Sequence, residues 1–250
     1  MKVTIITAVL NGERVIADTL ASVAAQRYGD IEHIVVDGAS RDATLEKVRE
    51  HGEHVARVIS EPDTGVYDAF NKGLKAASGD VVGFLNAGDV FVDDEVVGKI
   101  VTGFANPAIG AVFGDLVITH PDDPGLILRH YSGAGFSPGS LALGFAPPHP
   151  TLYLRSSVYR DCGGYDPSYR IAGDFDICLK IFLGRSTLYQ YIPETLVRMP
   201  SGGLSNSGWS SIIRNTRENL LACRKNGVPT SLFRMIGRLP IKWFEGRKRA

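Results

Sequence analysis

The sequence has few of the features that identify several common protein classes. Among its 250 residues only three are cysteines, Cys162, Cys178 and Cys223, and none forms a CxxC pair. Neither a disulfide framework nor a zinc knuckle is indicated, so a reducing cytosol is the expected location. The first apolar run, residues 3–9, meets an Asn-Gly pair too soon to be a signal peptide or a membrane span. The formal net charge is zero, which argues against a general nucleic-acid binder.

Familiar phosphate-binding loops are also missing. There is no Walker GxxxxGK[ST] loop, and the nearest approach to GxGxxG, residues 133–138, ends in proline and opens no obvious helix. A nicotinamide-dependent oxidoreductase therefore lacks its fingerprint here. A nucleotide bound by this chain is held in some other way than by a glycine cradle.

The first half of the chain alternates β-branched runs with segments of helical period. Continuous apolar runs such as VVGFL imply burial on both faces, as in a mostly parallel sheet between helix layers. The expected fold is α/β and Rossmann-like. Strands are predicted at 3–9, 31–37, 55–60 and 81–86, with a helix after the first that ends near Gln26, a second capped by Ser40 and a third over 65–77.

The second half is less regular. A Gly/Pro-rich stretch at 121–150 reads as binding loops. We expect one domain over residues 1–205 and a helical tail over 206–250. Other predicted elements are a helix at 94–104, a strand at 111–119, a strand and short helix before the Gly163-Gly164 turn, a helix at 173–184, a strand at 187–193, and two helical segments at 208–226 and 230–246.

Three predicted strands are followed by aspartate, namely Asp37, Asp63 and Asp89. A single aspartate at such a place is commonly a turn former or helix cap. The carboxyl ends of parallel strands share one edge of the sheet, where ligands of open α/β folds bind. Carboxylates gathered there need a compensating cation, and a divalent metal holding a diphosphate supplies one.

The ordered motifs ITAVLNGE, VVDGAS, EPDTGVYDAFNKGL, SGDVVGFLNAGD, GGYD and AGDFDICLK resemble the family 2 glycosyltransferases of GT-A fold. Bacterial members that build surface polysaccharides or glycolipids are the most similar. The resemblance covers roughly residues 2 to 205. It implies an inverting hexosyltransferase that uses a nucleotide-diphosphate sugar, a saccharide or lipid-linked acceptor, and Mn²⁺ or Mg²⁺.

The resemblance also assigns candidate residues. Asp89 matches the last position of the family's DxD metal motif, but Asn86-Ala87-Gly88-Asp89 supplies one acid where two are common, so Asn86 or water has to assist. Phe70 stands where many relatives carry arginine, which leaves Lys72 as a candidate phosphate contact. The implied nucleotide-sugar-binding residues are Thr7, Val9, Asn11, Glu13, Asp37, Asp63, Asn71 and Asn86.

The resemblance makes Asp174, the first acid of Gly-Asp-Phe-Asp, the base that deprotonates the acceptor hydroxyl. The alternative is that Asp174 only caps the following helix. Asp176 is interpreted as structural. His149 and Gly164 are candidates for the sugar or acceptor pocket, although a lone histidine is more often a packed structural residue.

From Arg214 onward the sequence has ten lysines and arginines against Glu218 and Glu245. Beyond residue 230, apolar residues through Trp243 share one side of a helical wheel, although Pro240 interrupts the pattern. The segment is either a helix packed on the domain or an interfacial helix for anionic lipid. The second interpretation predicts a cytoplasmic protein at the inner face of the membrane.

Two rival functions remain at this point. One is a non-catalytic nucleotide-sugar-binding subunit of a glycan-assembly complex, which the thinned metal motif allows and the presence of both Asp89 and Asp174 opposes. The other is a nucleotidyltransferase, whose glycine- and arginine-rich loop after the first strand TAVLNGER does not resemble.

Overall fold

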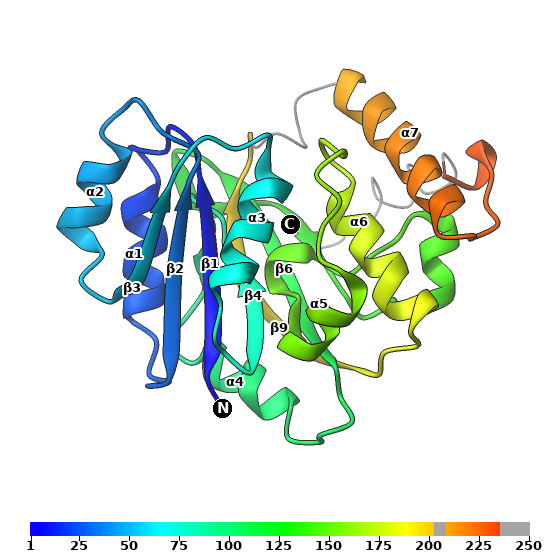
Figure 1. The fold of residues 1–250 in the computed structure, drawn as a ribbon, viewed down its shortest axis with the longest axis horizontal. Coiled ribbons are helices and arrows are strands. Elements are labelled where there is room, and N and C mark those ends of the chain that lie inside the picture. The colour runs from blue at the N-terminus through cyan, green and yellow to red at the C-terminus, as the bar shows by residue number, and fades with distance from the viewer. Residues whose placement is uncertain (203–208, 236–250) are drawn as a thin grey trace.

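The computed structural model describes residues 1–202 and 209–235, in which nine strands form one sheet with helices on both faces (Figure 1). Along the sheet the order is β3-β2-β1-β4-β8-β6-β9-β5, and β7 pairs with β6 outside this path. The α/β fold predicted from the alternating pattern is confirmed. The first half of the chain supplies β1 (Val3–Val9), α1 (Ile16–Ala24), β2 (Ile31–Asp37), α2 (Thr44–His51), β3 (Val55–Ser60), α3 (Val66–Ala76) and β4 (Val81–Phe84).

These first four strands are parallel, as the continuous apolar runs predict. All seven residues of β1 are buried, because the strand has a neighbour on each side and helices on each face. Parallel pairing places the carboxyl ends of all four strands at one edge of the sheet. That edge is the top of the sheet in Figure 1, where the N-terminus marks the opposite end of β1.

The second half of the sheet adds antiparallel pairs. Strand β8 is antiparallel to both β4 and β6, and β6 is parallel to β9. Strand β6 therefore runs in the same direction as β1, and its end lies at the same edge. The remaining elements are β5 (Val90–Phe91), α4 (Val96–Gly103), β6 (Ala111–His120), β7 (Asp123–Tyr131), η1 (Pro138–Leu143), η2 (His149–Thr151), β8 (Tyr153–Arg155), α5 (Ser156–Cys162), α6 (Gly173–Cys178), η3 (Leu179–Gly184), β9 (Tyr189–Pro200) and α7 (Trp209–Lys225).

Two expectations about local structure are wrong. Ser40 does not cap the second helix, which begins at Thr44 after Ala43; the Ser40 hydroxyl accepts the amide of Asn11 instead. The stretch 121–150 is not all loop, because residues 123–131 form β7. That strand exists through its backbone pairing with the edge of β6, a contact that local sequence does not encode.

Each face of the sheet has its own apolar core. Helices α3, α5 and α6 cover one face, where Ile6, Phe70 and Phe84 are packed. Helices α1 and α4 cover the other face over Val3, Ile5 and neighbouring residues, and α2 packs beside α1. Alternate residues of β1 serve the two cores, as the period of a strand requires.

The segment predicted as one helix over 173–184 is helical throughout, with α6 continuing into the π-helical turn η3. Helix α7 confirms the helix expected at 208–226, and Ala222 and Cys223 on its inner side are fully buried. Residues 232–235 are helical. The rest of the predicted tail helix, including Trp243, lies outside the described residues.

Candidate active site

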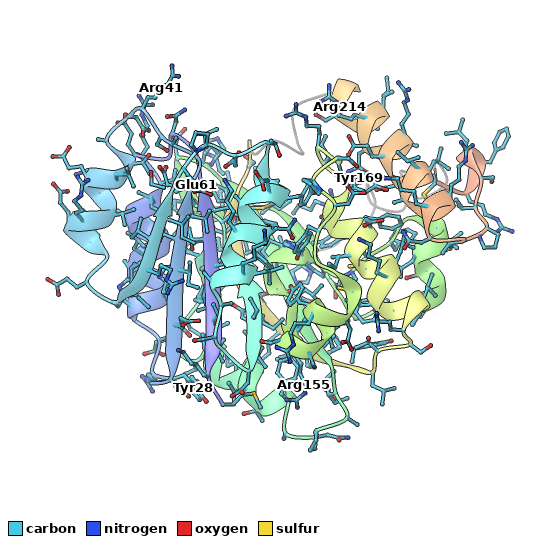
Figure 2. The ribbon with its side chains drawn as sticks, in the orientation of Figure 1. Tyr28, Arg41, Glu61, Arg155, Tyr169 and Arg214 are labelled. Atoms are coloured by element: carbon cyan, nitrogen blue, oxygen red, sulfur yellow. The ribbon has the colours of Figure 1, made fainter. Side chains whose placement is uncertain are left out.

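Loops from four parallel strands meet at the carboxyl edge of the sheet. Figure 2 places Arg41 and Glu61, which lie in the loops after β2 and β3, at this edge, whereas Tyr28 and Arg155 lie at the opposite one. The edge carries the three aspartates singled out from the sequence, because each follows or ends a strand. It is the place where ligands of open α/β sheets bind.

The loop after β1 is tied to the loop after β2 by side chains predicted to bind the donor. Asn11 has a left-handed backbone (φ 52°), and its Oδ1 accepts the amide of Arg41 at 2.9 Å. Glu13 Oε2 accepts the amide of Ala43 at 2.9 Å. These bonds give the two loops one fixed shape. Asn11 and Glu13 therefore lie at the carboxyl edge of the sheet, where their side chains also fix the backbone of the loop after β2.

Asp37 and Asp63 belong to adjacent loops at the same edge. The fully buried Asp37 carboxylate accepts the Ser60 hydroxyl at 2.7 Å and the amide of Ser40 at 3.1 Å. Asp63 Oδ1 accepts the amide of Gly65 at 3.0 Å, which shapes the turn into α3. An added Cβ at Gly38, the residue after Asp37, would lie 2.5 Å from Asp63 Oδ2, so the two aspartates occupy neighbouring loops.

The turn that carries Asp89 is held from α1. Thr19, which is fully buried, accepts the amide of Gly88 at 2.9 Å and donates its hydroxyl to the carbonyl of Asp89 at 2.9 Å. Gly88 has a φ of 97°, a conformation that side chains disfavour. The turn 86–89 is therefore fixed by one hydroxyl that satisfies two of its backbone groups.

The Asp89 side chain is a carboxyl group buried away from solvent. Only 5% of the residue is exposed, and burial raises the pKa of Asp89 to about 7, against a hydrogen bond from the Asn86 backbone that lowers it. Nearby, Asn86 Oδ1 is buried and has no hydrogen-bond partner among the described residues. A buried carboxylate and an orphaned amide oxygen in one turn are both hard oxygen ligands that suit Mg²⁺ or Mn²⁺.

Within residues 1–202 and 209–235 there is no cluster of three or more His, Cys, Asp or Glu side chains that could hold a metal ion. A metal with a single carboxylate ligand needs other oxygens, and Mg²⁺ sites commonly draw these from substrate phosphates and water. The residues present therefore fit a metal that is shared with a diphosphate and do not fit a closed protein cage.

Two predicted donor residues have side chains that face the core. The Thr7 hydroxyl is fully buried, donates to the carbonyl of Leu85 at 2.7 Å and lies 2.9 Å from His33 Nε2. Val9 packs in the apolar cluster with α1 and α2. As a correction, these two side chains support the ends of the strands and are not placed to contact a base or ribose.

Asp174 lies in the first turn of α6, beside the start of α3. The helix is preceded by Ala172, so Asp174 is not its N-cap; its Oδ1 accepts the adjacent amide of Phe175 at 2.7 Å. Tyr67, near the start of α3, donates its hydroxyl to the carbonyl of Ile171 at 2.5 Å, and Gly173 lies so close to its ring that an added Cβ would be 2.7 Å from a ring carbon. Since α3 begins just after the Asp63 loop, these contacts place Asp174 next to the carboxyl edge.

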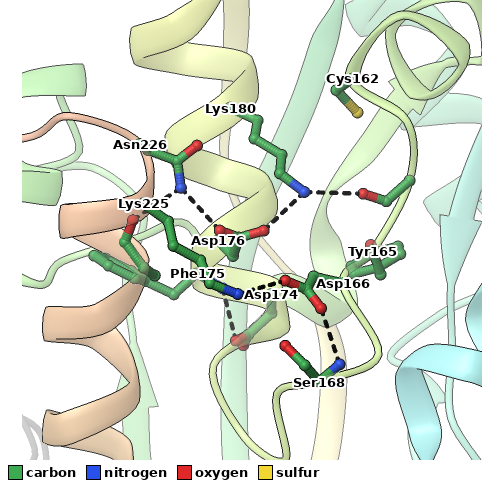
Figure 3. Close-up of polar contacts among 12 residues, drawn as sticks. Cys162, Tyr165, Asp166, Ser168, Asp174, Phe175, Asp176, Lys180, Lys225 and Asn226 are labelled. Carbon is green, nitrogen blue, oxygen red and sulfur yellow. Dashed lines mark hydrogen bonds and ion pairs between the residues drawn. The ribbon is translucent and has the colours of Figure 1, made fainter.

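Asp176 has the structural role expected of it. The residue is 2% exposed, its Oδ2 lies 2.8 Å from Lys180 Nζ, and its Oδ1 accepts the Asn226 amide at 2.8 Å (Figure 3). Lys180 also reaches the carbonyl of Gly164 at 3.4 Å. The two acids of the Gly-Asp-Phe-Asp motif thus differ in surroundings, since the second is locked in an ion pair.

His149 belongs to an aromatic cluster. Its ring stacks on Phe70 and Phe84 with centroids 5.5 and 5.6 Å apart, and its Nε2 lies 2.8 Å from the Tyr165 hydroxyl. Burial lowers the pKa of His149 to about 4, so the ring is neutral at pH 7. Phe70 is 2% exposed and fills this cluster. The cluster is apolar and holds no free cation.

Asn71, predicted to touch the nucleotide, is bound to the glycine turn. Its Oδ1 accepts the amide of Tyr165 at 2.9 Å, and its Nδ2 donates to the carbonyl of Tyr165 at 2.8 Å. Gly164 has a φ of 76°, and a Cβ there would lie 2.7 Å from Asn71 Oδ1. Glycine is thus required for this approach. Both residues position Tyr165, and as a correction the Asn71 amide is committed to this turn.

Lys72, the candidate phosphate contact, is also engaged. Its Nζ lies 3.1 Å from Glu61 and donates to the carbonyl of Pro62 at 2.6 Å. Sequence reasoning missed two residues that shape the site, Thr19 and Tyr67. Thr19 offers no signal along the chain, whereas Tyr67 lies within the EPDTGVYDAFNKGL motif.

Comparisons with known proteins identify the family of the chain. The model of glycosyl transferase family 2 matches residues 4–160. An uncharacterized glycosyltransferase of Mycobacterium tuberculosis is 34% identical over 186 residues, which cover 72% of this chain and 69% of the relative. A PGL/p-HBAD biosynthesis glycosyltransferase of Mycobacterium bovis is 28% identical over 209 residues, which cover 81% and 78% of the two chains. The chain belongs to glycosyl transferase family 2 and is a glycosyltransferase.

Solved structures share the fold. A mannosyltransferase from Pyrobaculum calidifontis in complex with GDP-Man and Mn²⁺ superposes with a TM-score of 0.70 at 20% identity, over 98% of this chain and 69% of the other. S. aureus TarS in complex with UDP-GlcNAc gives a TM-score of 0.64 at 18% identity, over 89% and 66%. The fold is GT-A, as the resemblance implied.

Proposed function

We propose that this glycosyltransferase moves a hexose from a nucleotide-diphosphate sugar to an acceptor hydroxyl in a single displacement that inverts the anomeric centre. The observation that carries the proposal is the arrangement of Asp174. It lies in the first turn of α6, and Tyr67 ties the segment just before this helix to the start of α3, next to the edge that carries Asp37, Asp63 and Asp89. Donor machinery and a candidate base thus meet at one edge.

In this proposal the loops after β1, β2 and β3 bind the nucleotide. Asn11, Glu13 and Asp63 form the binding surface with backbone groups of the same loops, and the buried Asp37 fixes these loops from beneath through its bonds to Ser40 and Ser60. Thr7, Val9 and Asn71 support this surface from behind. The mannosyltransferase and TarS structures carry GDP-Man and UDP-GlcNAc respectively, so a nucleotide sugar is the donor class that we expect.

Asp89 and Asn86 Oδ1 are proposed to hold Mn²⁺ or Mg²⁺ together with the donor diphosphate. Their burial and the missing partner of Asn86 Oδ1 support this assignment, and a related fold binds Mn²⁺ with its nucleotide sugar. When bound, the metal stabilises negative charge on the departing diphosphate. The positive charge of the metal would also compensate the Asp89 carboxylate, whose charged form burial disfavours.

Asp174 is proposed to accept the proton of the acceptor hydroxyl as its oxygen attacks the anomeric carbon and the bond to the diphosphate breaks. Asp176 is a poor candidate for this role because Lys180 and Asn226 occupy its oxygens. His149 is hydrogen-bonded to Tyr165 and Gly164 precedes it in the chain, so both lie beside this tyrosine on the proposed acceptor side. They are proposed to shape the pocket for the acceptor or sugar.

The reaction itself is the test of this proposal. The purified chain is incubated with a panel of nucleotide sugars and acceptor saccharides, and the anomeric configuration of the product is read by proton NMR. Wild type should give the inverted anomer, and Asp174→Asn should bind the donor while transfer falls by at least about 100-fold. Retained anomeric configuration, or normal transfer by Asp174→Asn, would refute the mechanism. Donor binding without turnover in wild type would favour the non-catalytic subunit.

We further propose that the acceptor is a saccharide or a lipid-linked glycan met at a membrane surface. In the described part of the chain no helix is long and apolar enough to cross a bilayer. Helix α7 and the residues after it expose Ile213 and Phe233, at 60% and 89%, among the cations of the basic tail. Apolar and cationic side chains together suit the surface of an anionic membrane.

Vesicle binding tests the membrane proposal. Sedimentation with vesicles of anionic lipid should capture the full chain and release a variant that ends at Pro229. Vesicles of neutral lipid serve as the control, because they remove the electrostatic attraction. Equal sedimentation of the full and shortened chains would refute the role of the tail.

A further inference from the structure

Helix α7 presents its single acidic residue to the segment that leads into α6. Glu218 Oε2 accepts three consecutive backbone amides, those of Arg170, Ile171 and Ala172, at 3.2, 2.9 and 3.0 Å. Its other oxygen, Oε1, lies 3.3 Å from the amide of Arg170. Charged acceptors of backbone amides form the stronger class of hydrogen bond, so this carboxylate is a firm anchor.

The anchored segment ends at the candidate base. Ala172 immediately precedes α6, and Asp174 is the second residue of that helix. The carbonyl of Ile171 accepts the Tyr67 hydroxyl, and Gly173 packs against the tyrosine ring. The backbone of residues 170–173, which leads directly into Asp174, is therefore held by Glu218 on one side and by Tyr67 on the other.

Two further side chains at the C-terminal end of α7 also bind residues close to the Gly-Asp-Phe-Asp motif. Lys225 Nζ lies 2.9 Å from Asp166 and Asn226 bonds Asp176, as Figure 3 shows. Helix α7 otherwise carries cations such as Arg214, which projects from the helix in Figure 2. The one negative side chain of a basic helix is thus placed against backbone amides.

We propose that Glu218 is a positioning residue for Asp174, and that α7 is part of the catalytic apparatus through this carboxylate. The inference rests on the proposed role of Asp174 as the base. A base has to lie within hydrogen-bond reach of the acceptor hydroxyl, and small displacements of such a group are costly to turnover. Among the described residues Glu218 bonds the backbone of residues 170–172 and not the donor loops after β1 to β4, so we expect donor binding to be independent of it.

The experiment compares Glu218→Gln, Asp174→Asn and the double variant in the full chain. Glutamine keeps the size of the side chain, but one of its two acceptor positions becomes an NH₂ donor that repels the backbone amides. Glu218→Gln should lower kcat at least about tenfold while the KM for the donor stays within about twofold. Arg217→Ala, an exposed change on the same helix, should leave both constants unchanged.

The double variant separates positioning from general damage. If Glu218 acts through Asp174, adding Glu218→Gln to Asp174→Asn should slow transfer no further, because the group to be positioned is already lost. A kcat of Glu218→Gln equal to wild type, a matching loss of donor affinity, or multiplicative effects in the double variant would overturn the inference. Normal turnover by Asp174→Asn alone would instead overturn the assignment of the base, and the positioning role with it.

Discussion

The hydroxyl of Thr19 offers a sharp test of how the metal turn is built. Thr19→Val keeps the shape of the side chain and removes one oxygen. That oxygen serves both the amide of Gly88 and the carbonyl of Asp89, each at 2.9 Å, and the residue is fully buried. Valine leaves both backbone groups without this partner.

A buried polar group that loses its partner costs about 1 to 3 kcal/mol. The carbonyl of Asp89 is buried and the amide of Gly88 is partly buried, so we expect Thr19→Val to lower the free energy of unfolding by about 2 to 4 kcal/mol. For a chain of this size that is a fall in Tm of about 4 to 16 °C. Affinity for the nucleotide sugar with Mn²⁺ should fall as well, because the turn that carries Asp89 and Asn86 loosens.

Thermal unfolding followed by circular dichroism measures the first effect, and titration of Mn²⁺ with the donor measures the second. Thr102→Val is the matched control, since the exposed Thr102 also donates to a carbonyl, that of Gly98 at 2.9 Å, which water can satisfy in its place. We expect a change within about 0.5 kcal/mol there. A Thr19→Val protein as stable as the control would refute the reasoning about this turn.

Two further predictions concern charge in the core. Lys180→Met strips the buried Asp176 of its cation and should cost about 3 kcal/mol, measured by urea denaturation. Lys47→Met breaks a pair whose side chains are 39% and 46% exposed and should leave the stability nearly unchanged, so equal losses in the two variants would contradict the difference in burial. For His149 the folded pKa of about 4 lies below the usual 6.5, so the neutral ring contributes stability that is present above pH 6.5 and is lost as the pH falls towards 4. The stability advantage of wild type over His149→Phe should therefore shrink by about 1.5 kcal/mol between pH 6.5 and pH 5, and an advantage independent of pH would show that the histidine is not buried as a neutral ring.

Much of the fold could be predicted because local pattern and tertiary environment agree in its first half. The runs at 3–9 and 31–37 are rich in β-branched residues, and both become strands within the sheet, the first of them buried throughout. Strand β7 could not be predicted in this way. Its Leu126, Ile127 and Leu128 are all about half exposed and do not alternate, and only pairing with β6 makes the segment a strand.

In the candidate site, too, only the features that local sequence and topology determine could be predicted. Aspartates after strands could be placed at one edge from topology alone, since parallel strands end together. The partners that hold them could not be placed, because each contact joins residues far apart in the chain. Thr19 bonds the turn at Gly88, Asn71 bonds Tyr165, and Glu218 reaches back to residues 170–172. Thr7 illustrates the error that follows, since a residue near a predicted loop can still face the core.

The most direct test is metal-dependent donor binding by wild type and Asp89→Ala. Isothermal titration with UDP-, GDP- and dTDP-sugars, each with and without Mn²⁺, should identify one donor that binds wild type only when the metal is present. Asp89→Ala should lose that binding while its unfolding transition stays cooperative, because the alanine removes a carboxylate that burial disfavours. Binding of no nucleotide sugar by wild type under any condition, or equal metal-dependent binding by Asp89→Ala, would contradict the proposed site.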